Sequence, residues 1–127
     1  MASEKKKILV IDDQEEVREL VEAALRDGGF EIFKAFGGRE GIQIAKNTRP
    51  DIIILDIMMP GGMDGYEVCK ILKSDSTTKK ITIIFLTAKG QEVDKEKGVA
   101  VGGNGFFTKP FSPLKLIEKI ENIFGQE

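Results

Sequence analysis

One pattern recurs five times along the chain: a short apolar run is followed by a segment whose apolar residues have helical spacing. The runs lie at residues 7–11, 30–36, 51–55, 81–86 and 105–109. The first, third and fourth lack the polar alternation of a strand with one face in water. Strands of this kind are buried on both faces, so the pattern predicts a parallel sheet that helices cover on each side.

The intervening segments carry the signals of helices. The first four helices are expected near residues 17–25, 41–46, 66–73 and 93–101. Gly98 interrupts the fourth, which is the weakest. The last has Ser112 as a candidate N-cap and Pro113 at the first helical position. With right-handed crossovers, five such βα units predict a doubly wound, three-layer α/β domain.

Length and composition indicate one globular domain over residues 1–127, with a core of about residues 6–125. The chain has 127 residues, of which 41% are hydrophobic and 31% charged, and no linker or output domain is expected within it. Its formal net charge of −2 gives no reason to expect direct binding to nucleic acid or an anionic membrane. The apolar runs are too short to span a bilayer and no signal peptide is apparent, so a cytoplasmic location is expected.

The absence of histidine and the scarcity of cysteine narrow the chemistry further. The chain contains no histidine, which excludes catalysis by its own imidazole groups and histidine-ligated zinc. Cys69 is the single cysteine, so neither an internal disulfide nor a thiolate metal site is available.

Polar residues end or directly follow four of the five apolar runs, where ligands bind in open α/β sheets. They are Asp12, Asp13, Asp56, Thr87 and Lys109. Taken singly, each has an ordinary explanation: a helix cap, a turn, a strand residue or a solvated charge. Taken together, they bring three carboxylates, a hydroxyl and an ammonium group to the same edge of the sheet.

The chemistry of that cluster favours a cation and a phosphoryl group. Three neighbouring carboxylates repel one another unless a cation lies among them, and oxygen ligands alone favour Mg²⁺. A carboxylate can act as a nucleophile and form an aspartyl phosphate. The negative charge of a transferring phosphoryl group would be stabilised by Mg²⁺, an ammonium group and a hydroxyl. These properties select Asp56 as the residue to be phosphorylated.

Five motifs resemble those of the receiver domains of two-component response regulators, in particular the single-domain, chemotaxis-regulator-like type. They are "VIDD", "IILDIMMP", "MDGYE", "IIFLTA" and "GFFTKPF". The resemblance covers almost the whole chain and implies a flavodoxin-like (βα)₅ fold with strand order 2-1-3-4-5. It implies that a histidine kinase or a histidine phosphotransfer protein donates a phosphoryl group to Asp56. Such a domain catalyses its own phosphorylation and dephosphorylation but acts mainly as a signalling switch.

The resemblance also assigns the metal ligands. Asp13, Asp56 and the backbone carbonyl of Met58 would ligate Mg²⁺, and Asp12 would act through water. Met58 and Lys89 would flank the phosphoryl group and control how fast water removes it. Neither side chain can orient a water as a carboxylate or amide does, so slow loss of the phosphoryl group is expected.

The remaining implied roles concern the signal. Lys109 would contact the phosphoryl group, and the peptide bond before Pro110 would be cis. Thr87 would report the phosphoryl group to Phe106 and so redraw the surface of the fourth helix, fifth strand and last helix. That surface is expected to bind a downstream protein, and a phosphorylation-dependent homodimer is left open.

The chain departs from the family pattern in three places. Gly61-Gly62 adds one residue to the loop before Met63, Gly103 replaces a usual alanine, and Phe106 lacks the hydroxyl of tyrosine. The extra residue leaves the path of the loop open, and Gly98 with Gly103 suggests a mobile fourth helix.

Other classes of function fit less well. A haloacid-dehalogenase-type, Mg²⁺-dependent aspartyl phosphatase needs a second acid where Met58 stands. A flavodoxin-like electron carrier would not place the acidic stretch "DDQEEV" against a flavin phosphate. An adaptor with the receiver fold that works without phosphorylation remains an alternative, although it would not need all five polar residues.

Overall fold

The computed structural model describes residues 5–59, 61–88 and 95–125, which form one parallel five-stranded sheet. The strands are β1 (Lys7–Ile11), β2 (Glu31–Ala35), β3 (Ile52–Asp56), β4 (Thr82–Ala88) and β5 (Gly105–Lys109). Their order in the sheet is β2-β1-β3-β4-β5, and each neighbouring pair is parallel. The predicted doubly wound fold and strand order are confirmed.

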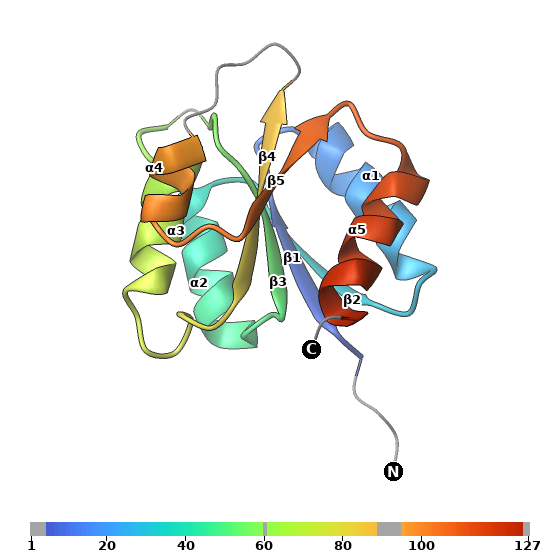
Figure 1. Cartoon of the computed structure of the whole chain (residues 1–127), viewed down its shortest axis with the longest axis horizontal. Helices are drawn as coiled ribbons and strands as arrows, with labels where there is room; N and C mark the ends of the chain where they lie inside the picture. The colour runs from blue at the N-terminus through green and yellow to red at the C-terminus, as the bar shows by residue number, and fades with distance from the viewer. Residues whose placement is uncertain (1–4, 60, 89–94, 126–127) are drawn as a thin grey trace.

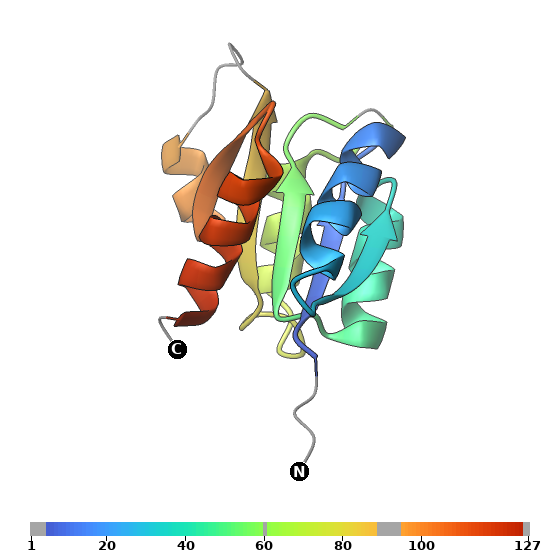
Figure 2. The ribbon, with the colours of Figure 1, turned by 90° about the vertical axis from the view of Figure 1, so that its right-hand side faces the viewer.

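Helices cover both faces of the sheet and make it the middle of three layers (Figure 1). They are α1 (Glu15–Arg26), α2 (Gly38–Thr48), α3 (Gly65–Lys73), α4 (Lys95–Ala100) and α5 (Pro113–Gly125). Figures 1 and 2 place α1 and α5 together on one face and α2, α3 and α4 on the other. All five strands point their carboxyl ends toward the same edge of the sheet, which we call the carboxyl edge.

Alternate residues of each strand supply two separate cores, because successive side chains point to opposite faces. Leu9, Leu55 and Phe85 belong to the core on the side of α2 and α3. Val10 and Ile54 belong to the core on the side of α1 and α5. All five residues of β3 are buried, which explains why its sequence has no polar alternation.

The start of β1 and the end of α5 lie beside each other at the opposite, amino end of the sheet. Phe124, near the end of α5, stacks on Phe30 with the ring centroids 5.6 Å apart. The Lys6 Nζ lies 5.3 Å from the centroid of the same Phe124 ring.

Element boundaries differ from expectation in informative ways. Asp56 is the last residue of β3 rather than the first after it, because the ladder to β4 continues to the pair Asp56 and Leu86. For the same reason β4 extends through Thr87 to Ala88. At the start of α5 the predicted cap is confirmed, since the Lys115 backbone N–H donates to Ser112 Oγ at 3.1 Å.

No helix in the described part of the chain has the length and apolar character that crossing a membrane requires.

Candidate functional site

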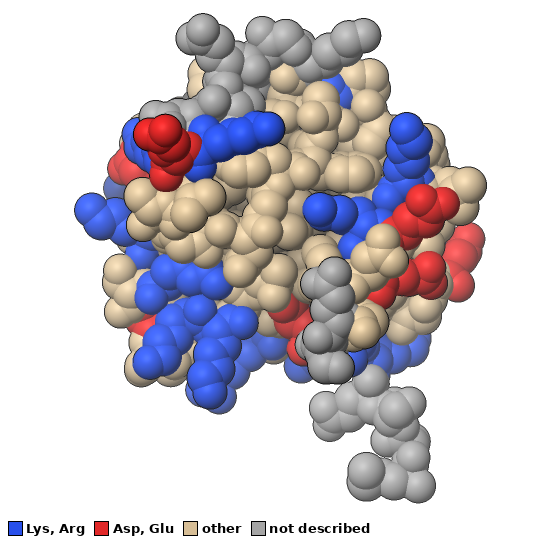
Figure 3. All heavy atoms as spheres, viewed as in Figure 1, with Lys and Arg blue, Asp and Glu red and all other residues tan. Residues whose placement is uncertain are grey.

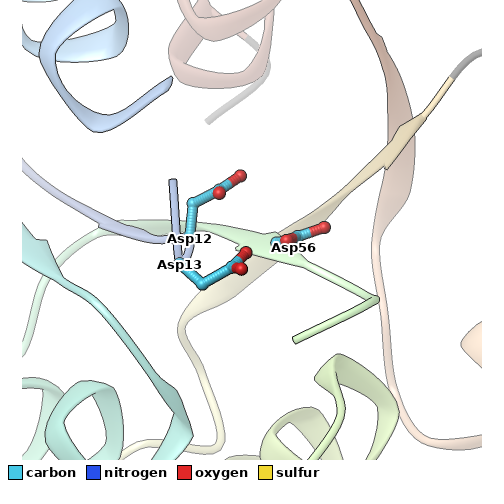
Figure 4. A group of neighbouring side chains, drawn as sticks. All are labelled: Asp12, Asp13 and Asp56. Atoms are coloured by element: carbon cyan, nitrogen blue, oxygen red, sulfur yellow. The ribbon is translucent and has the colours of Figure 1, made fainter. Parts of the chain in front are cut away.

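Three carboxylates meet at the carboxyl edge, where β1 and β3 lie side by side. Asp12 and Asp13 follow β1 directly, and Asp56 ends β3. Each contributes an oxygen atom to a group whose members all lie within 4.8 Å of one another (Figure 4). Asp12 and Asp56 are 0% and 3% exposed, whereas Asp13 is exposed. The sheet therefore brings together the three acids that the sequence selected.

Local structure fixes the orientation of the Asp12 carboxylate. Its Oδ1 accepts a 2.8 Å hydrogen bond from the backbone N–H of Gln14, the residue directly before α1. Its Oδ2 accepts from Lys109 Nζ at 3.1 Å. The Arg18 guanidinium, one helical turn further on, donates to the Asp12 backbone carbonyl at 2.8 Å. The N-cap of α1 is Gln14, which makes no side-chain capping hydrogen bond, so Asp13 does not occupy the cap position.

Lys109 supplies the ammonium group that faces this cluster. It ends β5, and its Nζ lies 3.7 Å from Asp56 Oδ1 as well as 3.1 Å from Asp12 Oδ2. Nζ also donates to Gln14 Oε1 at 3.4 Å. The lysine side chain is only 15% exposed, so its charge is poorly screened by water.

One ammonium group does not neutralise three carboxylates. Burial raises the pKa of Asp56 to about 7, and the negative charge of Asp12 adds to the effect although Lys109 opposes it. Burial also raises the pKa of Asp12. The cluster is thus short of positive charge and offers only oxygen ligands, which is the donor set that suits a hard cation such as Mg²⁺.

Thr87 and Phe106 lie on the neighbouring strands β4 and β5. Thr87 is 4% exposed, and its hydroxyl lies 3.5 Å from that of Thr108 on β5. The Phe106 ring packs against Phe85, with centroids 5.4 Å apart. Thr87 therefore lies near the carboxyl edge, whereas Phe106 is the second residue of β5 and pairs with Phe85, two residues before Thr87.

Gly98 and Gly103 pack closely on these aromatic rings. A Cβ atom added to Gly98 would lie 2.5 Å from Phe106 Cζ, and one added to Gly103 would lie 2.9 Å from the carbonyl oxygen of Gly98. A side chain at either position would force the ring or the helix to shift. The two glycines thus have a packing role beyond the helix mobility that the sequence suggests, and that mobility stays a prediction.

The other predicted residues lie around the rim. Met58, two residues after Asp56, has a 64% exposed side chain. Lys89 lies outside the described residues. The additional loop glycines, Gly61 and Gly62, have φ angles of 98° and 97°, a conformation that glycine adopts readily. The Lys109–Pro110 peptide bond is cis, as the resemblance implies.

A groove of about 400 Å³ opens beside Lys109. It lies between the first half of α1 and the segment that follows β5, and Val17, Leu20 and Phe111 are among its apolar lining residues. The groove adjoins the acidic cluster through Gln14 and Lys109, which line it, but none of the three carboxylates is among its lining residues.

Residues 8–121 of the chain match the sequence family of the response regulator receiver domain. This chain belongs to the response regulator receiver domain family. Domains of this family take part in two-component signalling with histidine kinases and downstream effectors, and they typically bind Mg²⁺ at an acidic pocket.

Relatives of this receiver domain include transcriptional regulators and chemotaxis proteins. The chain is 39% identical to the phosphate regulon transcriptional regulatory protein PhoB of Pseudomonas aeruginosa over 93% of its own length and 51% of that protein. It is 39% identical to the alkaline phosphatase synthesis transcriptional regulatory protein PhoP of Bacillus subtilis, over 93% and 48% of the two chains. The chain thus spans about half the length of these curated relatives.

Solved structures give the same result. The Vibrio cholerae chemotaxis protein CheY4 superposes with a TM-score of 0.87 at 35% identity, covering 94% of this chain and 98% of that one. A putative response regulator from Chloroflexus aurantiacus also gives a TM-score of 0.87 at 35% identity, with 96% and 99% coverage.

The receiver structure adds three residues that the sequence did not select. Gln14 and Arg18 hold Asp12 and Lys109, and Thr108 faces Thr87. Gln14 and Arg18 are one helical turn apart at the start of a helix, and this spacing indicates that both side chains lie on the same face of the helix. Thr108 required the register between β4 and β5, which sequence spacing does not define.

Proposed function

We propose that Asp56 accepts a phosphoryl group from the phosphohistidine of a histidine kinase or a histidine phosphotransfer protein. The observation that supports this most is the position of Asp56: a buried carboxylate at the carboxyl edge, beside two further acids and 3.7 Å from the Lys109 ammonium. All the residues that this scheme requires belong to the one receiver domain.

The transfer is a substitution at phosphorus. An oxygen of Asp56 attacks, an O–P bond forms and the N–P bond of the donor breaks. The bonding electrons leave with the imidazole nitrogen, which then takes up a proton. Lys109 stabilises the charge on the phosphoryl oxygens because its Nζ already lies beside Asp56. Gln14 and Asp12 hold that ammonium group in place.

Asp13, Asp56 and the backbone carbonyl of Met58 would hold Mg²⁺, and Asp12 would act through water. When bound, the ion supplies positive charge to the phosphoryl oxygens and relieves the repulsion among the carboxylates. Asp12 is already oriented by hydrogen bonds from Gln14 and Lys109, so it needs little reorganisation. Met58, with Lys89, would govern the access of hydrolytic water to the aspartyl phosphate.

In this proposal, a phosphodonor approaches Asp56 by way of the groove beside Lys109. Its apolar lining includes Leu20, which is 39% exposed, and Phe111. Apolar side chains at the mouth of a charged site favour contact with a protein or an imidazole ring over contact with water alone.

Phosphorylation would reach the surface of α4, β5 and α5 through Thr87 and Phe106. The Thr87 hydroxyl would bond a phosphoryl oxygen, and the movement of Phe106 would reshape the surface. Val99 on α4 and Leu114 on α5 are 68% and 64% exposed. Figure 3 shows that the middle of this side of the molecule is mainly uncharged. A downstream protein, or a second copy of the chain, would bind there.

The test is phosphoryl transfer from acetyl phosphate, followed by intact-mass spectrometry. We expect the wild-type chain to gain one phosphoryl group with Mg²⁺ and none with a chelator. Asp56→Asn should gain none under either condition. Equal labelling of the two proteins would exclude Asp56 as the acceptor. A wild-type chain that gains nothing from acetyl phosphate or from a phosphorylated histidine phosphotransfer protein would instead support a phosphorylation-independent adaptor.

A further inference from the structure

The ends of β4 and β5 place two threonine hydroxyls opposite each other. Thr87 pairs with Thr108 in the ladder, and their Oγ1 atoms are 3.5 Å apart. Thr87 is 4% exposed, whereas Thr108 is exposed to solvent. In this arrangement the Thr87 hydroxyl donates and the Thr108 hydroxyl accepts. The buried hydroxyl of the proposed switch is therefore directed at β5.

The order of the strands makes this direction significant. β4 lies between β3, which carries Asp56, and β5, which carries Thr108. A Thr87 hydroxyl that turns toward β5 therefore turns away from β3. A hydroxyl group also has a single proton to donate, so it cannot donate to Thr108 and to a phosphoryl oxygen at the same time.

We infer that Thr108 is a positioning residue, which holds the Thr87 hydroxyl away from Asp56 until a phosphoryl group is present. This inference rests on the proposed function of Asp56 and Thr87. Thr108 touches neither Asp56 nor the phosphoryl group in this scheme, and it acts by competing for the Thr87 proton.

The geometry suits a restraint that is easily released. At 3.5 Å the contact is long for a bond between two hydroxyls and is correspondingly weak. A phosphoryl oxygen is charged and accepts a shorter, stronger hydrogen bond. The solvent-exposed Thr108 hydroxyl finds water when it is released, so its separation from Thr87 leaves no buried group unpaired.

The restraint lowers the apparent affinity of the resting protein for a phosphoryl group. Only molecules whose Thr87 hydroxyl is free to turn have the full set of phosphoryl contacts, and apparent affinity falls with the fraction of such molecules. Removing a weak hydroxyl bond should therefore raise the apparent affinity about two- to fivefold.

Beryllofluoride, a mimic of the phosphoryl group on a carboxylate, tests this in the presence of Mg²⁺. Its apparent affinity is measured by NMR titration for wild type, Thr108→Val and Thr108→Ser. Valine keeps the β-branched shape and removes the hydroxyl, whereas serine keeps the hydroxyl. We expect tighter binding only for Thr108→Val, with Mg²⁺ affinity close to wild type and a lower melting temperature, because the buried Thr87 hydroxyl loses its partner. Thr108→Ala serves as a second hydroxyl-free variant if the valine variant does not fold.

The same substitution in a Thr87→Ala background separates competition from packing. Without the Thr87 hydroxyl, Thr108→Val should leave beryllofluoride affinity unchanged. An equal gain in both backgrounds, a gain for Thr108→Ser as large as for Thr108→Val, or no gain in wild type would each overturn the inference. A wild-type chain that does not bind beryllofluoride at all would instead overturn the proposed function of Asp56.

Discussion

The carboxyl edge of the sheet has an acidic half and a neutral half, and the two are organised by different physics. At the ends of β1 and β3, three acids face one ammonium group, and the pKa of Asp56 is raised to about 7. Near the ends of β4 and β5, Thr87 and Thr108 carry no charge, and Phe106, two residues before Thr108, packs against Phe85. Lys109 ends β5, but its ammonium group faces the acids and is counted with them. We call these the acidic half and the switch half.

The difference would allow one edge both to perform the reaction and to transmit the signal that we propose. Repulsion in the acidic half gives cations and charged ligands a large effect on free energy. In the switch that we propose, the weak hydrogen bond between Thr87 and Thr108 would leave the two states similar in free energy, so a small bias would move the population. Substitutions should therefore have large effects on chemistry in the first half and smaller effects on coupling in the second.

The largest effect is expected from removing the one ammonium group of the acidic half. Lys109→Met should slow phosphorylation of Asp56 by acetyl phosphate by about 10²- to 10³-fold, because it removes preorganised charge at the phosphoryl oxygens. Rates are measured by intact-mass spectrometry over time. Lys115→Met, which removes an exposed lysine of α5, is the matched control and should react like wild type. Equal rates for the two variants would mean that Lys109 does not act on the reaction.

The second prediction concerns the stability of the metal-free acidic half. The pKa of Asp56 is raised from 3.8 to about 7 on folding, so its carboxyl stabilises the fold below about pH 4 and that contribution is lost as the pH rises through about 7. In a chelator, Asp56→Asn should therefore be more stable than wild type at pH 8 by on the order of 2–4 kcal/mol, with a smaller difference at pH 4. Denaturant unfolding measures both values.

Two comparisons sharpen that result. Glu121→Gln, on the exposed side of α5, should show no such pH dependence. Mg²⁺ should reduce the advantage of Asp56→Asn at pH 8, because a bound cation stabilises the charged wild-type site. If the difference in free energy of unfolding between Asp56→Asn and wild type did not depend on pH, ionisation of Asp56 would not destabilise the folded protein.

In the switch half, close packing predicts a smaller effect. Gly98→Ala places a Cβ atom where the tip of the Phe106 ring lies and should lower the free energy of unfolding by about 1–3 kcal/mol. Gly125→Ala is the control, because a Cβ there has no neighbour within 4 Å. Phe106→Leu should relieve most of the loss in a double-mutant cycle. Additive losses would mean that α4 does not rest on this ring.

The smallest effect is expected at Met58, an exposed residue two positions after Asp56. Met58→Asn should change the rate of spontaneous dephosphorylation by less than about tenfold, because an exposed amide can position water but lacks the strength of a general base. Met58→Leu keeps an apolar shield and should retain the wild-type rate. Rates that are identical in all three proteins would show that Met58 does not control access of water.

The fold could be predicted from the sequence because uninterrupted apolar residues indicate directly which strands are buried on both faces. The residues of β3 before Asp56 are all apolar, and all of β3 is buried between two layers of helices. The acidic half was equally predictable, since parallel neighbouring strands must bring Asp12, Asp13 and Asp56 to one edge.

The switch half was less predictable because it depends on contacts between residues distant in sequence. Gly98 was interpreted from local helix propensity, but its close approach to Phe106 arises from the placement of α4 over β5. Thr108 faces Thr87 only because of the register of β4 and β5. The boundary at Asp56 was wrong by one residue, because the ladder with Leu86 outweighs the weak strand preference of aspartate.

Because Lys6 and Phe30 both contact Phe124, the two ends of the domain are close together, which favours insertion of the domain into another protein. The first strand begins and the last helix ends at the edge of the sheet remote from Asp56. Neighbouring chain ends permit a domain to be spliced into a surface loop of another protein, or to be circularly permuted, with little distortion. A reporter protein interrupted by this chain would keep the carboxyl edge open to phosphodonors. Its optical signal could then follow phosphorylation without any label near the reaction.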